Sequence, residues 1–478
     1  MNRPIRRVAI GCLTLVLILL LGDNLVQVVE ATSLRNRPEN SRQINARLSR
    51  ERGPIVVGGR AIAESVPSND QYKFQRTYPG AQLYSNVTGY YGFFGSTGVE
   101  KSEDDLLSGE DQRLFVKRIS DLFTGRKVKG GSVVLTIKPE VQQAAATALG
   151  GRKGAVVALN PTTGAILAMV TQPGFDPSPL ASHDGRKATS AEQALANDPD
   201  DPLINRPAQG LYPPGSTFKI ITSAAALSNG YTSQSQIDAP RSLVLANTRT
   251  TLPNFQGESC GGNGTTTMID ALTTSCNTAY AKLGISIPGK GEALRRQAEA
   301  FGFNTPLSGF PLPTSTSRFP SGLDDAQTEL SSIGQANVLV TPLQMAMVAA
   351  TVANGGREMK PYIVDKTLAP DLTTLQTTSP EEMARPIDGN VASELNQMMQ
   401  SVVQNGTGTA AQLSVPVAGK TGTAENVPGR PTHAWFVGFA PADNPQVAVA
   451  VIVENGGQGG TVAAPIARQV MSAALGLG

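Results

Sequence analysis

The sequence predicts a mixed α/β (α+β) protein built on an antiparallel sheet, with a smaller mixed domain before it. Three short apolar strands follow one another near the C-terminus, at 415–421, 434–439 and 447–453. Short loops between consecutive strands favour antiparallel pairing. Apolar helices are expected at 345–352 and from Ala463 onward. The chain has 478 residues, which suits two domains with additional segments.

The composition is that of a globular protein with a sizeable core. Hydrophobic residues make up 40% of the chain and charged residues 16%, and the net charge is only +2. A charge so close to zero does not indicate a nucleic-acid partner. The chain has two histidines, His183 and His433, and three cysteines, too few for a multi-histidine or Cys/His metal site. We therefore expect neither a metal nor a cofactor.

The N-terminal 30 residues contain an apolar run that follows three arginines. Arg3, Arg6 and Arg7 precede residues 8–21, and positive charge before an apolar run places the N-terminus on the cytoplasmic side. The uninterrupted run is shorter than the ~20 residues that span a bilayer, so a cleaved signal peptide is one interpretation. Apolar residues continue to Val29 and no A-x-A cleavage site follows. These features favour an uncleaved, single-pass anchor with the remaining chain outside the cell membrane.

The rest of the chain divides into a small domain at 31–150 and a larger one at 151–478. The small domain is expected to contain a hairpin, a strand and a helix, at 54–63, 132–137 and 139–149. The larger domain should begin with a hairpin at 155–170. Its later segments are an irregular Pro- and Asp-rich stretch at 173–206, a helix opened by Ser216, and an amphipathic helix at 391–403.

The segment before Ser216 has the pattern of a turn that enters a helix, because Pro213, Pro214 and Gly215 interrupt regular structure. Lys219 follows three residues later and lies on the same helical face. A serine is a weak nucleophile until a base removes its proton. A lysine can be that base only if burial or a second cation lowers its pKa towards neutrality. Taken alone, this S-x-x-K favours an ordinary helix start with a solvated lysine.

Two further motifs change this interpretation. Residues 275–277 are Ser-Cys-Asn, an S-x-N motif, and residues 420–423 are Lys-Thr-Gly-Thr. S-x-x-K, S-x-N and K-T-G in this order are the signature set of penicillin-binding proteins and class A β-lactamases. The chain therefore resembles the penicillin-recognising serine transferases. Residues 212–219, 334–337 and 341–346 are similar to class B penicillin-binding proteins, and the short N-terminal region resembles the penicillin-binding protein A type.

The resemblance implies a five-stranded antiparallel sheet with helices on both faces and an N-terminal pedestal domain. It also implies a peptidoglycan D,D-transpeptidase. Ser216 would attack the penultimate D-alanine of a D-Ala-D-Ala stem peptide and release free D-alanine. An amine from a neighbouring stem would then resolve the acyl-enzyme into a cross-link. β-Lactams would acylate the same serine, and D,D-carboxypeptidase activity would be a side reaction.

The family pattern also assigns roles to the motif residues. Lys219 would be the base, Lys420 the second cation that keeps it neutral, and Ser275 the relay that passes a proton to the departing amine. The backbone N–H groups of Ser216 and Thr423 would form the oxyanion hole. The remaining expected roles are to hold the substrate amide, to bind the terminal carboxylate of the substrate and to let the substrate backbone approach the strand closely. These substrate-binding residues are Asn277, Lys420, Thr421, Gly422 and Thr423.

Cys260 and Cys276 lie in a Gly/Thr-rich stretch that the anchor would place outside the membrane, where disulfides persist. We expect the two cysteines to pair, and two buried thiols are the alternative. Further expected partners are the membrane, a peptidoglycan glycosyltransferase and other cell-wall assembly proteins. The sequence leaves open whether the role lies in cell shape or in cell division.

Three other functions share some of these features. A serine β-lactamase needs a deacylating base, and no E-x-x-L-N motif occurs between Asn277 and Lys420. A membrane-anchored β-lactam sensor needs several membrane spans and a cytoplasmic output domain, whereas only seven residues precede the apolar run. An inert scaffold would lack a motif residue, and all are present. The transpeptidase interpretation is therefore preferred.

Overall fold

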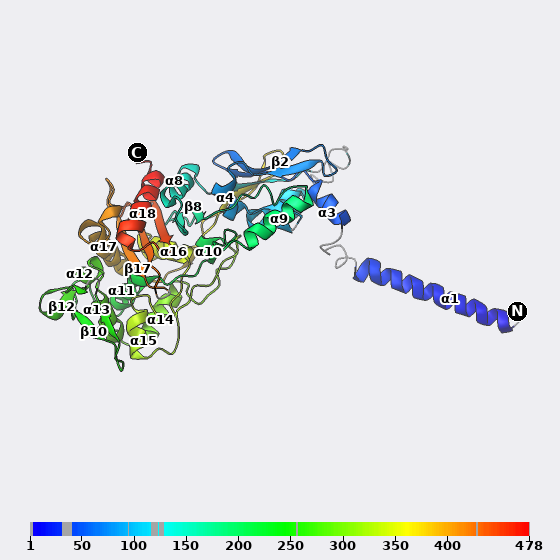
Figure 1. Ribbon diagram of the computed structural model, residues 1–478. Helices are drawn as coiled ribbons and strands as arrows, with labels where there is room; N and C mark the ends of the chain where they lie inside the picture. Colours follow the sequence, from blue (N-terminus) through cyan, green and yellow to red (C-terminus); the bar gives the residue numbers. More distant parts are fainter. Residues whose placement is uncertain are drawn as a thin grey trace.

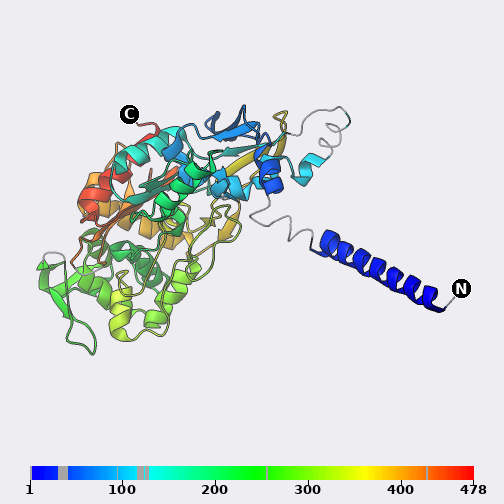
Figure 2. The same ribbon diagram turned by 45° about the vertical axis from the view of Figure 1, so that its right-hand side comes forward.

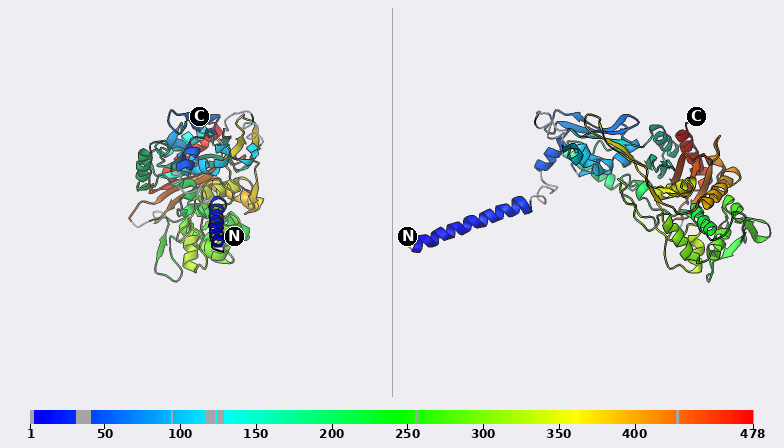
Figure 3. Two further views of the ribbon diagram at one scale, coloured as in Figure 1. Left: turned by 90° about the vertical axis from the view of Figure 1, so that its right-hand side faces the viewer. Right: turned by 180° about the vertical axis from the view of Figure 1, so that it is seen from behind.

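The computed structural model describes residues 3–30, 41–93, 95–115, 123, 129–254, 257–426 and 429–477. Helix α1 (Arg3–Asn24) continues into a π-helical turn, η1 (Leu25–Val29), and projects away from the rest of the molecule (Figure 3). Together they form one helix of 27 residues, which contains an 18-residue stretch with a mean hydropathy of 2.2 and is long and apolar enough to cross a membrane. The expected domain boundary at residue 31 lies outside the described residues.

The larger lobe is built on a five-stranded sheet with the order β17-β18-β19-β7-β8, and every neighbouring pair is antiparallel. The strands are β17 (Ala418–Ala424), β18 (His433–Ala440), β19 (Val447–Val453), β7 (Gly154–Leu159) and β8 (Ile166–Gln172). This confirms the predicted five-stranded antiparallel sheet. Strands β7 and β19 are buried at every position, which explains why their sequences are apolar throughout rather than alternating.

Helices cover both faces of this sheet and form two separate cores (Figure 1). On one face lie α8 (Pro139–Leu149) and α18 (Gly459–Leu475). On the other lie α11 (Lys219–Ser228), α16 (Pro342–Ala353) and α17 (Gly389–Asn405). Successive residues of β19 alternate between the two cores because successive side chains of a strand point to opposite faces.

The smaller lobe contains a six-stranded sheet with the order β15-β14-β6-β1-β2-β3. Its strands are β1 (Ile55–Val57), β2 (Arg60–Pro67), β3 (Phe74–Thr77), β6 (Ser132–Leu135), β14 (Val364–Leu368) and β15 (Thr374–Thr377). Thus β14 and β15 come from the C-terminal half of the chain and lie beside the N-terminal strands (Figure 2). Conversely, α8 packs on the larger sheet. Segments from both sides of the predicted boundary at residue 150 therefore contribute to each lobe.

Connecting elements complete both lobes. In the first part of the chain they are α3 (Ser41–Leu48), α4 (Ala81–Thr88), β4 (Tyr91–Gly92), β5 (Gly95–Ser96), α5 (Gly98–Ser102), α6 (Asp104–Ser108), η2 (Gln112–Leu114), α10 (Arg206–Gln209), η3 (Gly215–Phe218) and β9 (Gln236–Asp238). Further along they are β10 (Ser242–Val244), β11 (Thr251–Pro253), η5 (Gly262–Gly264), β12 (Thr265–Thr267), α12 (Met268–Thr273), α13 (Asn277–Ser286), α14 (Lys290–Ala300), α15 (Asp325–Ser331), β13 (Glu358–Met359), β16 (Glu382–Ala384) and η6 (Thr409–Ala411).

Three local predictions differ from the structure. The segment at 173–206 contains a twelve-residue helix, α9 (Gly185–Ala196), where we expected irregular chain. Asp184 caps this helix by accepting hydrogen bonds from two backbone N–H groups of its first turn, which offsets the polar composition. The strand predicted at 415–421 begins only at Ala418, after Pro416, and the C-terminal helix begins at Gly459, four residues before Ala463.

A buried carboxyl group without partners lies on β13. Glu358 is 1% exposed, and neither of its carboxylate oxygens has a hydrogen-bond partner in the described part of the chain. Burial raises the pKa of Glu358 to about 8. The side chain is therefore protonated in the folded protein at neutral pH but ionised in the unfolded chain.

This difference predicts that Glu358→Gln raises the free energy of unfolding by an amount that depends on pH. The wild type should lose stability relative to the variant as the pH rises from about 4.5 to about 8, because only the unfolded chain releases the proton in this window. The difference in free energy of unfolding should grow by up to about 1.4 kcal/mol per pH unit. Urea unfolding at several pH values measures it, with the exposed Glu382→Gln as control. A difference that does not vary with pH would contradict this account.

Candidate active site

Ser216 lies in the 3₁₀ turn η3, which leads directly into α11. The turn is held by two glycines with positive φ, Gly215 at 52° and Gly334 at 72°. The Gly215 N–H donates a 3.0 Å hydrogen bond to the Gly334 carbonyl. A Cβ on Gly334 would lie 2.2 Å from the Gly215 carbonyl oxygen, so both the conformation and the contact require glycine.

The residues just before the turn are fixed by neighbouring elements. Tyr212 exchanges backbone hydrogen bonds of 3.0 and 2.8 Å with Val340. The indole N–H of Trp435, a fully buried residue of β18, donates to the Pro213 carbonyl at 3.0 Å. A Cβ on Gly422 would lie 2.9 Å from side-chain atoms of both Thr217 and Trp435. The absence of a side chain at Gly422 therefore allows the Ser216 turn to pack against β17. This packing role is additional to the close approach of the substrate backbone that the sequence predicts for Gly422.

Lys219 is the first residue of α11 and is fully buried. Its Nζ donates to the carbonyl of Ser275 at 2.7 Å, to Ser275 Oγ at 3.3 Å and to Asn277 Oδ1 at 2.9 Å. Burial, and then the charge of Lys420, lower the pKa of Lys219 well below its ordinary value. The half-buried Ser216 hydroxyl makes no hydrogen bond to any residue that the structure describes, Lys219 included.

Lys420 also bonds the hydroxyl of Ser275, which Lys219 contacts. Its Nζ donates to Ser275 Oγ at 2.8 Å and to the carbonyl of Thr421 at 2.8 Å. The side chain is fully buried, and burial lowers the pKa of Lys420 to about 7. Ser275 Oγ thus lies between two amines, and their mutual repulsion disfavours the state in which both are protonated. The cluster is therefore able to accept a proton near neutral pH.

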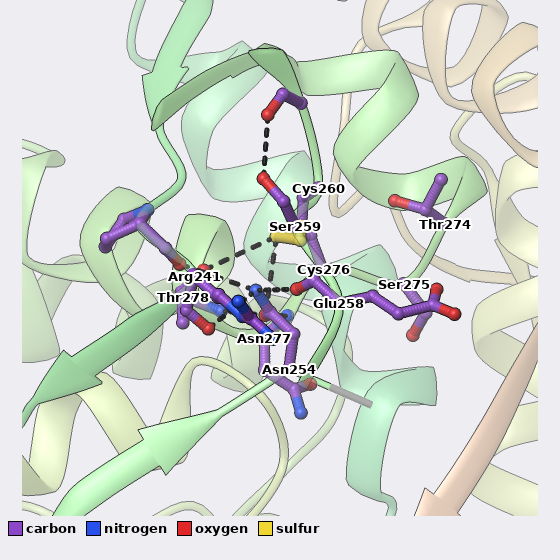
Figure 4. Close-up of a disulfide and its surroundings, with 12 residues drawn as sticks. Arg241, Asn254, Glu258, Ser259, Cys260, Thr274, Ser275, Cys276, Asn277 and Thr278 are labelled. Atoms are coloured by element: carbon purple, nitrogen blue, oxygen red, sulfur yellow. Dashed lines mark hydrogen bonds between the residues drawn. A yellow bond between two sulfur atoms is a disulfide. The ribbon is translucent and has the colours of Figure 1, made fainter. Parts of the chain in front are cut away.

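The S-x-N loop that carries Ser275 and Asn277 lies beside a disulfide (Figure 4) and has a constrained backbone. Ser275 has a φ of 61°, which is uncommon for a residue other than glycine and occurs often at functional sites. Between the two polar residues, Cys276 forms a disulfide with Cys260. This bond ties the loop to the chain that follows β11.

Asn254 also holds this loop, and the sequence analysis missed it. Its Oδ1 accepts hydrogen bonds of 3.0 Å from the backbone N–H groups of both Asn277 and Thr278, at the start of α13 (Figure 4). Asn254 therefore caps α13 from outside the helix, because the first N–H groups of a helix have no partner within it. No sequence pattern marks this role, since the capping residue is not adjacent to the helix.

The edge strand β17 presents Thr421 and Thr423 beside the lysines. Thr421 Oγ1 shares a 2.6 Å hydrogen bond with Oγ1 of Thr407, and Thr423 Oγ1 accepts from the Gly459 N–H at 3.5 Å. Thr407 belongs to the glycine-rich stretch after α17, and its N–H also donates to the carbonyl of Thr273 at 3.2 Å. This loop therefore joins β17 to α12, the helix that leads into the S-x-N loop, a connection that the sequence analysis did not predict.

The two histidines lie outside the lysine cluster. His183 contacts Asp70 in the smaller lobe at 2.5 Å. His433 packs edge-to-face on Tyr212, and burial lowers its pKa. Neither histidine bonds Ser216 in the described structure, so no Ser-His pair forms there. Among the described residues, no group of three or more His, Cys, Asp or Glu side chains is arranged to hold a metal ion.

The disulfide should contribute measurably to stability. We expect the double variant Cys260→Ala, Cys276→Ala to lose about 2–4 kcal/mol in free energy of unfolding, because the bond closes a loop in the unfolded chain. Urea unfolding of the oxidised protein measures the loss. Cys12→Ala, which removes the exposed third cysteine, is the matched control. Equal stability of the double variant and the control would contradict the prediction.

Comparison with known proteins matches two families to this chain. Residues 154–472 match the penicillin binding protein transpeptidase domain. Residues 52–133 match the penicillin binding protein A dimerisation domain. The first range contains the five-stranded sheet and all three motifs, and the second lies in the smaller lobe.

Individual relatives resemble the chain over nearly its whole length. It is 44% identical to the peptidoglycan D,D-transpeptidase PbpA of Mycolicibacterium smegmatis and 42% identical to that of Mycobacterium tuberculosis H37Rv, with 99% of each chain covered. Among solved structures, the ceftriaxone acyl-enzyme of M. tuberculosis penicillin-binding protein A matches with a TM-score of 0.88 and 43% identity, covering 90% of this chain and 100% of that one. The penicillin G acyl-enzyme matches with a TM-score of 0.86 and 43% identity, covering 89% and 100%.

Proposed function

Because the chain belongs to the penicillin-binding protein family, as a class B member of the penicillin-binding protein A type, we propose that its lysine–serine cluster performs peptidoglycan D,D-transpeptidation. The chain is a serine acyl-transferase with the penicillin-recognising transpeptidase fold. The observation that carries the proposal is the convergence of Lys219 and Lys420 on Ser275 Oγ, beside the turn that holds Ser216. Its substrates are peptidoglycan stem peptides, and β-lactams are acylating inhibitors.

The reaction begins with attack by Ser216 Oγ on the carbonyl of the penultimate D-alanine. Lys219 takes the hydroxyl proton, because its lowered pKa favours the unprotonated amine that can act as a base. The substrate brings the two groups into contact, since hydrogen bonds in an unliganded site often tighten only in the complex. Asn277, whose Oδ1 accepts from Lys219, lies where its amide can also orient the substrate backbone.

The developing oxyanion is bound by the N–H groups of Ser216 and Thr423. A Cβ on Gly215 would lie 2.9 Å from the Thr423 carbonyl oxygen, so this carbonyl faces the turn. In an extended strand the N–H and C=O of one residue point to the same side. The Thr423 N–H therefore faces the turn as well, at the free edge of β17.

Collapse of the tetrahedral intermediate breaks the peptide bond and requires a proton on the departing amine. Ser275 Oγ supplies it and is reprotonated by the lysine amines that flank it at 2.8 and 3.3 Å. The terminal carboxylate binds the hydroxyls of Thr421 and Thr423, with the charge of Lys420 behind them. An amine from a second stem then attacks the ester, and the same proton path operates in reverse.

The location of the chain follows from its N-terminal helix and its disulfide. We propose that α1 is a single-pass anchor with a cytoplasmic N-terminus and that both lobes lie outside the membrane. This topology puts Cys260 and Cys276 in a compartment where disulfides persist and puts Ser216 where peptidoglycan is found. A glycosyltransferase and other cell-wall assembly proteins are the proposed partners.

The central test is the intact mass of the full-length protein in detergent after addition of benzylpenicillin. We expect one adduct that persists for hours and maps to Ser216. Ser216→Ala should form no adduct, because the nucleophile is absent, whereas the matched control Ser228→Ala, at the exposed end of α11, should be acylated like the wild type. Acylation of Ser216→Ala would refute the assignment. An adduct that disappears while penicillin is consumed would instead identify a β-lactamase.

A further inference from the structure

A tyrosine ring lies beneath the amine of Lys219. Helix α11 carries Lys219 and Ser223 four residues apart, and α13 carries Asn277 and Tyr280 three residues apart, so each pair shares one face of its helix. The two faces meet. Lys219 Nζ donates to Asn277 Oδ1 at 2.9 Å, and Ser223 Oγ shares a 2.6 Å hydrogen bond with the Tyr280 hydroxyl. Lys219 Nζ lies 5.3 Å from the centroid of the Tyr280 ring.

The surroundings of Lys219 make this ring significant. Lys219, Ser223 and Tyr280 are each 0% exposed, so bulk water does not solvate the amine. The hydrogen-bond acceptors around Lys219 Nζ are neutral oxygens of Ser275 and Asn277, and no carboxylate in the described part of the chain pairs with it. The ammonium that forms when Lys219 takes a proton therefore lacks a counter-ion there.

The face of a neutral aromatic ring attracts a cation within about 6 Å, and most strongly where water is excluded. Burial raises the pKa of Tyr280, so the phenol remains neutral and acts through its ring face rather than as an anion. The hydrogen bond to Ser223 holds the hydroxyl end of the ring against α11. The titratable groups that face Lys219 Nζ in the described structure are thus Lys420 from β17, which opposes its protonation, and Tyr280 from α13.

We propose that Tyr280 is a positioning residue for acyl transfer, whose ring, held by Ser223, stabilises the ammonium form of Lys219 after it has taken the Ser216 proton. The inference rests on the proposed function, in which Lys219 is the base. Burial and Lys420 lower the pKa of Lys219 and so favour the free amine before the reaction, and the ring offsets part of their effect. Lys219 is then basic enough to accept the proton and acidic enough to return it through Ser275.

The pH profile of acylation tests this role in the full-length protein. We would measure the second-order rate constant with benzylpenicillin between pH 5 and 10, where the acid limb reports protonation of the base. Tyr280→Leu removes the ring, so the ammonium form is less favoured and the limb should move to lower pH by about 0.5 to 1 unit. Tyr280→Phe keeps the ring, and its limb should stay within about 0.3 unit of the wild type.

Two further variants are measured in the same experiment. Tyr231→Leu is the matched control, because the hydroxyl of Tyr231 bonds the Ser286 carbonyl at the other end of α13, and its limb should not move. Tyr280→Met, with an unbranched side chain that fills irregular gaps, replaces Tyr280→Leu if the latter does not fold.

The outcomes are separable. A limb that is unchanged or moves to higher pH in the ringless variant would overturn the proposal, and so would a shift in Tyr280→Phe as large as in Tyr280→Leu. The proposed function is tested separately by the mass adduct at Ser216 and its loss in Ser216→Ala. A normal adduct with an unmoved limb would reject the role of Tyr280 while leaving the function intact.

Discussion

The structure depends on the burial of two lysine side chains around one serine hydroxyl. Removing an amine from water disfavours its charged form, and placing a second amine nearby disfavours it further. Lys219 and Lys420 are both fully buried and both donate to Ser275 Oγ, so their usual full protonation is not maintained. In the proposed mechanism the reactivity of Ser216 follows from this constraint, because the lowered pKa of Lys219 favours an amine that can act as a base without any histidine.

Such a cluster requires a rigid frame, which the five-stranded sheet provides. Both faces of the sheet are covered by helices, and only its outer strand β17 leaves an edge towards the Ser216 turn. Gly422 and Gly215 allow this edge and the turn to approach as closely as backbone atoms permit. The frame therefore fixes the distance between the K-T-G strand and the nucleophile, which is a condition for proton transfer within a bound substrate complex.

Residues outside the three motifs hold the motifs in place. Asn254 and the Cys260–Cys276 disulfide fix the S-x-N loop from one side, and Thr407 connects the K-T-G strand to the helix that precedes that loop. The ring of Tyr280, which Ser223 bonds through its hydroxyl, lies against the amine of Lys219. Apart from Ser223, which acts through Tyr280, each of these groups acts on a motif residue through a hydrogen bond, a covalent bond or a ring contact. Substitutions at such positions are expected to alter acylation without removing any reacting atom.

The sequence by itself determined the chemistry and most of the elements. The three motifs identified the lysine–serine cluster, and apolar periodicity with turn residues located the strands at 447–453 and the helix at 139–149, because these signals are local. Only the tertiary structure decided that β14 and β15 complete the N-terminal sheet, that α8 packs on the other sheet, and that Asn254, Thr407 and Tyr280 meet the motifs. Their partners are distant in sequence, and contacts between distant segments are set by how the helices and sheets pack rather than by any pattern along the chain.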